Sequence, residues 1–238
     1  LSKWEFNGWA KYKNFKNDNK AFLKVNKSKK FKVIKPKYRK KKIVLEGGSI
    51  DVNGSGLILT TMQCLLSKVQ QRNKGFKKND YNKIFNKFFG TRKIIWLNKG
   101  IQGDDTHGHV DDIARFVGKN KIFMATEKNK KDKNFKNLKE NIEIIKKFKR
   151  KNEEKFKIIY VPMPKPKFMD GIRLPASYLN FYIANKIVLV PSFNDPKDKI
   201  VLKIFRKHFK NRQVVLIDSS VLVWGFGTIH CLTQQEPK

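Results

Sequence analysis

The chain has 238 residues, of which 39% are hydrophobic and 12% aromatic, so it can bury a sizeable core and is not a disordered chain. Its apolar runs fall well short of the ~20 residues that a membrane-spanning helix needs, and no signal-peptide pattern is present. The net charge of +34 indicates either a polyanionic partner or a compositional bias.

The first 42 residues are weakly patterned. Residues 4–9 (WEFNGW) are rich in aromatic side chains and are predicted to form a strand end or an ordered loop. Pro36 lacks a backbone donor, so the segment around it is predicted to be a surface loop or an irregular edge. Because the chain begins with Leu1 rather than methionine, we expect its N-terminus to be missing or processed.

A pattern of strands and a helix begins at residue 43. Residues 43–47 and 56–61 are predicted strands, and residues 79–89 are predicted to form an amphipathic helix that stops at Gly90. Residues 93–97 (KIIWL) are typical of a buried strand.

The same pattern then returns twice. The second unit has predicted strands at 110–116 and 121–126, a helix at 135–150 and a strand at 157–161. The third unit has predicted strands at 179–184 and 186–190, a helix at about 196–209 and a strand at 213–217. A last strand, at about 228–233, has no helix after it.

The units recur every 60–70 residues, and their polar residues fall at matching places. These residues lie at or just before the first strand of each unit, and others lie on the closing strand: Glu46, Asp51, His109, Asp111, Asn180, His230 and Cys231. Units arranged in a ring would bring these positions to one centre, whereas an open solenoid would leave them along one face. The ring accounts for more, because it assembles one site from distant segments.

Residues 103–112 (GDDTHGHVDD) hold four carboxylates and two imidazoles in a chain otherwise crowded with lysine. Carboxylates beside an imidazole can hold a cation and move a proton at neutral pH. The same residue types also ligate metals, or form a polar turn at a helix start. No pair of cysteines and no HExxH motif is present, so no metal site is predicted.

A thiol and an imidazole facing several carboxylates favour attack on a cationic carbon. Cys231 is the candidate nucleophile and His109 the candidate general acid and base, although a free cysteine is more often a small buried hydrophobe. Glu46, Asp111 and Asp105 suit a planar cation, because carboxylates bind a guanidinium fork in a bidentate way. Two further expectations are that Cys64 is a core residue and that His230, next to Cys231 on a regular strand, points to the opposite face.

Five segments resemble the agmatine deiminases of the peptidyl-arginine deiminase-like group, within the guanidine-modifying superfamily. They are WEFNGW at 4–9, LEGGSIDVNG at 45–54, WLNKGIQGDDTHGHVDDIARF at 96–116, RLPASYLNFYIANKIVLVPSFND at 173–195 and WGFGTIHCLTQQEP at 224–237. The resemblance implies an α/β fold, a five-bladed α/β-propeller (pentein) of ββαβ repeats, with residues 1–238 as one catalytic domain.

The resemblance also implies an activity. Members hydrolyse agmatine to N-carbamoylputrescine and ammonia in polyamine biosynthesis, through a cysteine-linked thiouronium intermediate and without a cofactor. Residue by residue, Cys231 falls on the nucleophile, His109 on the acid/base, and Glu46 and Asp111 on the guanidinium-binding carboxylates. Peptidyl-arginine deimination and an inactive basic binding module remain open as alternatives, and a homo-oligomer is compatible with the sequence.

The chain departs from the family in two ways. Family members carry about a hundred further residues before the segment at 4–9, including an Arg-Asp element whose Asp binds the guanidinium. We therefore expect this chain to lack most of the first blade and one carboxylate. The high lysine content is the second departure. The two cysteines form no disulfide framework, which predicts a reducing, cytoplasmic setting.

The positive charge is predicted to be incidental. Its lysines are dispersed, the abundance of Lys, Asn, Ile and Phe is typical of an AT-rich coding sequence, and no nucleic-acid motif is present. We expect RNA and DNA to bind without sequence preference and to dissociate steeply between low and physiological salt, as measured by fluorescence anisotropy over a salt series. A sequence-specific complex that survives physiological salt would contradict this.

Overall fold

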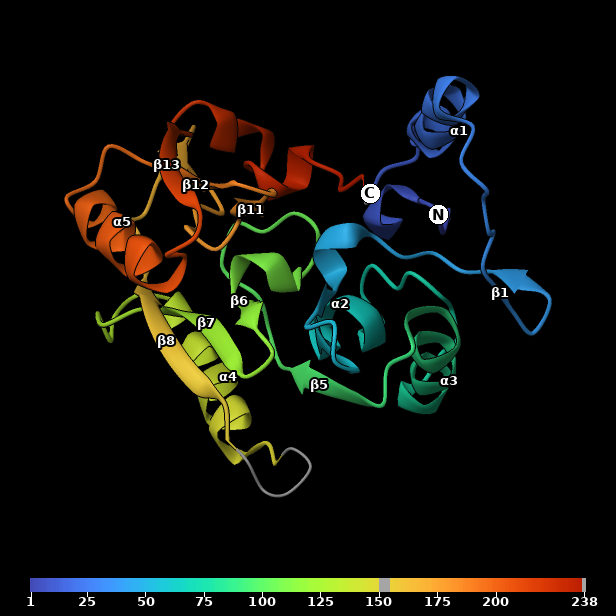
Figure 1. The fold of residues 1–238 in the computed structure, drawn as a ribbon, viewed down its shortest axis with the longest axis horizontal. Helices are drawn as coiled ribbons and strands as arrows, with labels where there is room; N and C mark the ends of the chain where they lie inside the picture. Colours follow the sequence, from blue (N-terminus) through green and yellow to red (C-terminus); the bar gives the residue numbers. More distant parts are fainter. Residues whose placement is uncertain (150–154, 237–238) are drawn as a thin grey trace.

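Repeated units of two strands, a helix and a strand make up most of the computed structural model, which describes residues 1–149 and 155–236. In each unit the first strand is antiparallel to the second, and the second is parallel to the third through a crossover helix. The three sheets lie around a common centre, with the helices α3, α4 and α5 on the outside (Figure 1). The α/β class and the recurrence predicted from the sequence are thereby confirmed.

The first unit consists of β3 (Asp51–Val52), β4 (Leu57–Thr61), α3 (Lys78–Phe89) and β5 (Lys93–Leu97). A short helix, α2 (Met62–Leu66), follows β4 directly. The apolar face of α3 covers the sheet, and the helix ends at Gly90, whose φ of 63° is the left-handed conformation that favours glycine.

The second and third units repeat this order. The second has β6 (Ala114–Gly118), β7 (Lys121–Thr126), α4 (Asn134–Lys147) and β8 (Lys157–Pro162). The third has β11 (Tyr182–Ile183), β12 (Ile187–Ser192), α5 (Lys197–His208) and β13 (Gln213–Asp218). The predicted helices are confirmed in position; Arg150, the last residue of the helix predicted at 135–150, lies outside the described residues.

The N-terminal 42 residues were the least predictable. They contain a helix, α1 (Asp18–Lys29), that the sequence did not indicate, because none of its residues is buried and no apolar stripe marks it. A hairpin, β1 (Lys37–Tyr38) and β2 (Lys41–Lys42), follows, and a second hairpin, β9 (Phe168–Met169) and β10 (Ile172–Arg173), lies between the second and third units.

Two predicted strands are wrong for the same physical reason. Residues 43–47 form one bridge, between Val44 and Glu5, because the side-chain amide of Asn73 bonds both the N–H and the C=O of Val44. Residues 228–233 contain a 3₁₀ helix, η6 (His230–Leu232), because the N–H groups of residues 230 and 231 donate to the side-chain oxygen of Asn180. In both places a side chain takes the role of a strand neighbour.

Three short 3₁₀ helices meet where the units converge. They are η2 (Gly47–Ser49), η3 (Val110–Asp112) and η6, and η2 contacts both of the others. Each follows or carries residues of the predicted site, so the ends of distant segments come together at the centre of the molecule.

A buried arginine joins all three units at this centre. Arg115 of β6 donates from Nε to Asp51 Oδ1 of β3 (3.0 Å) and from Nη1 to the backbone oxygens of Leu179 (3.2 Å) and Phe181 (3.0 Å). Its guanidinium also lies 4.6 Å from the centre of the Phe181 ring. One side chain thus fixes the third unit and the first against the second.

Aromatic side chains outside the centre also connect the second and third units. Phe205 of α5 lies with its ring 4.9 Å from those of Phe123 in β7 and Phe181, so the helix of the third unit covers both sheets. Across the described residues no helix is long and apolar enough to cross a membrane.

Replacement of Arg115 tests the connection. We expect Arg115→Met to lower the free energy of unfolding by about 2–4 kcal/mol, because it leaves the largely enclosed Asp51 carboxylate without its cation. Urea unfolding followed by circular dichroism would measure the loss. Arg206→Met on the exposed side of α5 is the matched control and should change stability by less than about 0.5 kcal/mol. Equal effects of the two substitutions would contradict the central role of Arg115.

Candidate active site

The residues predicted from the sequence line one cavity of about 1260 Å³ at the centre. Its walls include all five residues predicted for the site: Glu46, Asp105, His109, Asp111 and Cys231. The convergence that a ring requires is therefore present, and it arises from the meeting of η2, η3 and η6.

Glu46 is held by a buried arginine. It caps η2 in an extended conformation, and its carboxylate accepts from Arg72 Nε at 3.0 Å (Oε1) and 3.3 Å (Oε2). Arg72 is fixed in turn by bonds to the backbone oxygens of Gln70 and Thr106. Burial alone would raise the pKa of Glu46, but His109 and Arg72 outweigh it and hold that pKa below its usual value. Glu46 is therefore an anion.

His109 follows a tight loop organised by Asp104. That carboxylate accepts from the N–H groups of Thr106 (2.8 Å), Gly108 (2.7 Å) and His109 (2.9 Å), so the backbone of the loop is bound at three points. The imidazole is buried, with Nε2 3.4 Å from Glu46 Oε2. Burial would lower the pKa of His109, but contacts with Cys64, Glu46 and Asp111 raise it well above the ordinary value. The favoured species is the imidazolium.

Asp111 is fully buried, and its two oxygens differ. Oδ2 accepts from His230 Nδ1 (2.7 Å) and Asn180 Nδ2 (3.1 Å), whereas Oδ1 is buried without a hydrogen-bond partner among the described residues. Burial would raise the pKa of Asp111, but His230 and His109 lower it below its usual value. Oδ1 is an anionic acceptor ready for a donor.

The neighbouring carboxyl behaves in the opposite way. Burial and the charge of Asp111 raise the pKa of Asp112 well above its usual value, so Asp112 holds its proton more tightly than Asp111 does. The two side chains are bridged by Asn180, whose Nδ2 lies 3.1 Å from an oxygen of each. The environment thus shifts the pKa values of two adjacent carboxyl groups in opposite directions.

Cys231 lies on η6 and lines the cavity. Sγ lies 3.2 Å from Asn180 Nδ2 and 3.9 Å from Asp111 Oδ2. A side chain at Gly227 would come within 3.0 Å of the sulfur, so only glycine leaves room for it there. Burial and the nearby carboxylates raise the pKa of the Cys231 thiol well above its usual value. Without a cation beside it, the candidate nucleophile is a neutral thiol.

Asp105 lines the cavity but is already engaged. Its carboxylate pairs with Lys11 and accepts from Tyr12 Oη at 2.6 Å, while its backbone oxygen accepts from Gln70. These contacts tether the N-terminal segment, which includes Trp9 in a left-handed conformation, to the loop before His109. The geometry gives Asp105 an anchoring position.

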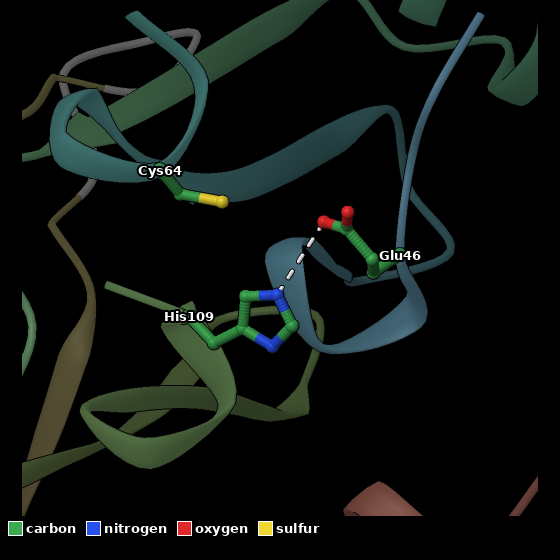
Figure 2. A group of neighbouring side chains, drawn as sticks. All are labelled: Glu46, Cys64 and His109. Atoms are coloured by element: carbon green, nitrogen blue, oxygen red, sulfur yellow. Dashed lines mark ion pairs between the residues drawn. The ribbon is translucent and has the colours of Figure 1, made fainter. Parts of the chain in front are cut away.

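Several residues at the centre were missed or misplaced by the sequence patterns. His230 was expected to face away from Cys231, but the 3₁₀ turn directs it onto Asp111. Arg72 follows a polar loop with no periodic signal, and Asn180 was singled out without a role. Cys64 is buried in the core as predicted, yet its sulfur also faces Glu46 and His109 (Figure 2). Among the described residues, these three side chains form the one cluster that could hold a metal ion.

Gly48 explains the close approach of two of these groups. A side-chain carbon at this position would lie 2.5 Å from His109 Nδ1 and 2.9 Å from Asp111 Oδ2. The Gly-Gly step after Glu46 therefore lets the η2 backbone touch the imidazole and the carboxylate together.

Comparison with known proteins agrees with this arrangement. The family model described as Porphyromonas-type peptidyl-arginine deiminase matches residues 1–237. A Legionella pneumophila relative is 39% identical over 197 residues, and an agmatine deiminase of Medicago truncatula is 36% identical over 216 residues. Both matches cover 82% of this chain, but only 56% and 57% of the relatives, so the chain spans little more than half of their length.

A solved structure gives the same result. The chain superposes on a cysteine-to-serine variant of C. jejuni agmatine deiminase with substrate bound, with a TM-score of 0.85 and 33% identity. The match covers 97% of this chain and 66% of that one.

The pairing of His109 with Glu46 can be tested by titration. We expect Glu46→Gln to lower the pKa of His109, because the imidazolium loses an anionic neighbour 3.4 Å away. NMR of the imidazole protons over a pH series would measure the change. Since the folded pKa is raised above the ordinary ~6.5, imidazolium formation stabilises the fold fully below that pH, and this contribution disappears as pH rises through the folded value.

Glu143→Gln, on the exposed side of α4, is the control and should leave the titration of His109 unchanged. A pKa for His109 that is the same in Glu46→Gln and in the unsubstituted chain would show that the Glu46 carboxylate is not its cause.

Proposed function

Because the chain belongs to the Porphyromonas-type peptidyl-arginine deiminase family, the family of hydrolases that includes its agmatine deiminase relatives, we propose that it is part of an agmatine deiminase. The reaction is hydrolysis of agmatine to N-carbamoylputrescine and ammonia, a step toward putrescine. The observation that carries the proposal is the convergence of Glu46, His109, Asp111 and Cys231 on one cavity.

The charges of the cavity favour a planar cation. Glu46 and Asp111 are ionised, and Asp111 Oδ1 is a buried acceptor without a partner among the described residues. A buried anionic acceptor is costly unless a donor reaches it, so a ligand carrying several N–H groups and a positive charge would be stabilised there. A guanidinium presents both properties in a fixed fork.

The same cation would prepare the nucleophile. The pKa of the Cys231 thiol is raised by burial and by the carboxylates around it. A guanidinium placed between these groups offsets the negative charge, lowers the thiol pKa and favours the thiolate. Substrate binding would thus generate the attacking group, whose proton passes to solvent, and an empty cavity would keep it unreactive.

The chemistry then proceeds in two halves. Cys231 Sγ attacks the guanidinium carbon, and the C–N bond to the departing ammonia breaks as His109, present as an imidazolium, donates its proton to that nitrogen. The neutral imidazole then takes a proton from a water that attacks the thiouronium carbon, and the C–S bond breaks to release Cys231. Glu46 and Asp111 orient the substrate throughout, which is catalysis by positioning.

The fold of the whole protein is part of the proposal. The three described units have the ββαβ order of a propeller blade, and we place them in a five-bladed α/β-propeller with residues 1–238 in one catalytic domain. The likeness to solved agmatine deiminases, including one of Enterococcus faecalis at a TM-score of 0.89, supports this placement.

The decisive test is the thiol. In the complete gene product we expect Cys231→Ala to abolish ammonia release from agmatine. Acid-quenched mass spectrometry of the unsubstituted enzyme should show an adduct whose added mass equals agmatine less ammonia, absent from the variant. Val221→Ala, an exposed residue near Cys231 in the sequence, is the control and should keep both signals. Matching thermal midpoints would show that all three proteins are folded.

Each other outcome has a definite meaning. Unchanged turnover in Cys231→Ala would rule out the thiol mechanism. Ammonia release from a blocked arginine peptide but not from agmatine would show that the substrate is peptidyl-arginine and not agmatine. No release from either would make the chain a non-catalytic member of the family. Residues 1–238 alone are expected to be nearly inactive, and full activity from them would show that the described carboxylates suffice.

A further inference from the structure

Three potential metal ligands face one another at the cavity wall. The Glu46 carboxylate, the Cys64 thiol and His109 Nε2 come from the loop before η2, from α2 and from the loop before η3, and these ligand atoms lie within 4.8 Å of one another. Figure 2 shows the three side chains pointing into a common space. The reaction derived above uses Glu46 and His109 but gives no part to Cys64.

The imidazole at this point has an unmet hydrogen-bonding need. His109 Nε2 is buried and makes no hydrogen bond to any described residue, although Glu46 Oε2 lies 3.4 Å away. The other imidazole at the centre differs, because His230 Nδ1 is 2.7 Å from Asp111 Oδ2. A buried ring nitrogen that makes no hydrogen bond and lies between a thiol and a carboxylate points to a ligand that all three can share.

We propose that Glu46, Cys64 and His109 form a binding site for a zinc-like divalent cation. One sulfur, one imidazole nitrogen and one carboxylate oxygen are ligands that Zn²⁺ takes together. Bonds of about 2.0–2.3 Å place tetrahedral ligand atoms roughly 3.3–3.7 Å apart. The Nε2 to Oε2 separation of 3.4 Å already has this spacing, and Sγ, which lies within 4.8 Å of the other two ligand atoms, must move closer.

The surroundings suit such an ion. Arg72 donates its shorter bond to Glu46 Oε1, which leaves Oε2 on the side of His109, and a hydrogen-bonded carboxylate is the usual form of a metal ligand. Glu46 and His109 line the cavity, which gives the ion a path of entry and water a place at the fourth position.

The site has a functional consequence that depends on the proposed reaction. An ion bonded to His109 Nε2 and to the Cys64 sulfur displaces the imidazolium proton and the thiol proton to solvent. His109 then has no proton to donate, so the cation would be a reversible inhibitor that leaves Cys231 untouched. The binding itself does not depend on the reaction and can be measured without substrate.

Cadmium provides the test, since a bound thiolate gives a charge-transfer band in the ultraviolet. Titration of the reduced full chain should give one such band per chain, with Zn²⁺ competing for it. Cys64→Ala should remove the band, and Cys231→Ala should keep it. His109→Gln retains the Cys64 thiol but removes a ligand of the ion. It should weaken cadmium binding by more than ~10–100-fold, which is the cost of losing a residue that only hydrogen-bonds a ligand. Circular dichroism of each variant checks folding.

The contrary results are equally clear. A band that is lost in Cys231→Ala and kept in Cys64→Ala would place the ion on the nucleophile and overturn the proposal, as would the absence of any band. If cadmium binds as expected but ammonia is never released, the ion site stands and only the proposed function fails.

Discussion

The centre of the molecule depends on a single guanidinium. Arg115 lies in β6, and its bonds reach a carboxylate of the first unit and two backbone oxygens of the third. Because repeated units contact mainly their neighbours, a buried connection at the point where all three meet fixes their relative orientation. The short 3₁₀ helices η2, η3 and η6 are held against one another in the same region, so the rigidity of the site follows from the way the units are joined.

Around this point the protein sorts ionisable groups by environment. The pKa of Asp111 is lowered and that of Asp112 is raised although they are adjacent in the chain, and burial together with the charge of Asp111 raises the pKa of the Cys231 thiol. His109 is charged for the opposite reason, since anionic neighbours outweigh its burial. The charges are set before any ligand arrives, which is the condition for electrostatic preorganisation.

Periodic segments were predictable from the sequence because burial leaves a repeating pattern. The helices at 79–89 and 196–209 carry an apolar stripe and appear where it predicts, whereas α1 buries nothing and left no signal. The strands failed at 43–47 and 228–233, where Asn73 and Asn180 bond the backbone in place of a strand. Residue types and spacing indicated Glu46, His109, Asp111 and Cys231, but the packing partners Arg72 and Cys64 depend on tertiary contacts that no local pattern records.

The surface and the cavity of this chain carry opposite signs of charge. Its net charge of +34 extends a repulsive potential toward any approaching cation, while the carboxylates that attract such a cation act only within the cavity. The long-range electrostatic field therefore opposes the approach of a cation to the protein, whereas the short-range field of the carboxylates favours its binding in the cavity. Dissolved salt screens the outer field, with a Debye length of about 8 Å at physiological ionic strength, and hardly reaches the enclosed carboxylates. A cationic ligand should accordingly associate faster as salt is added, the reverse of ordinary electrostatic steering.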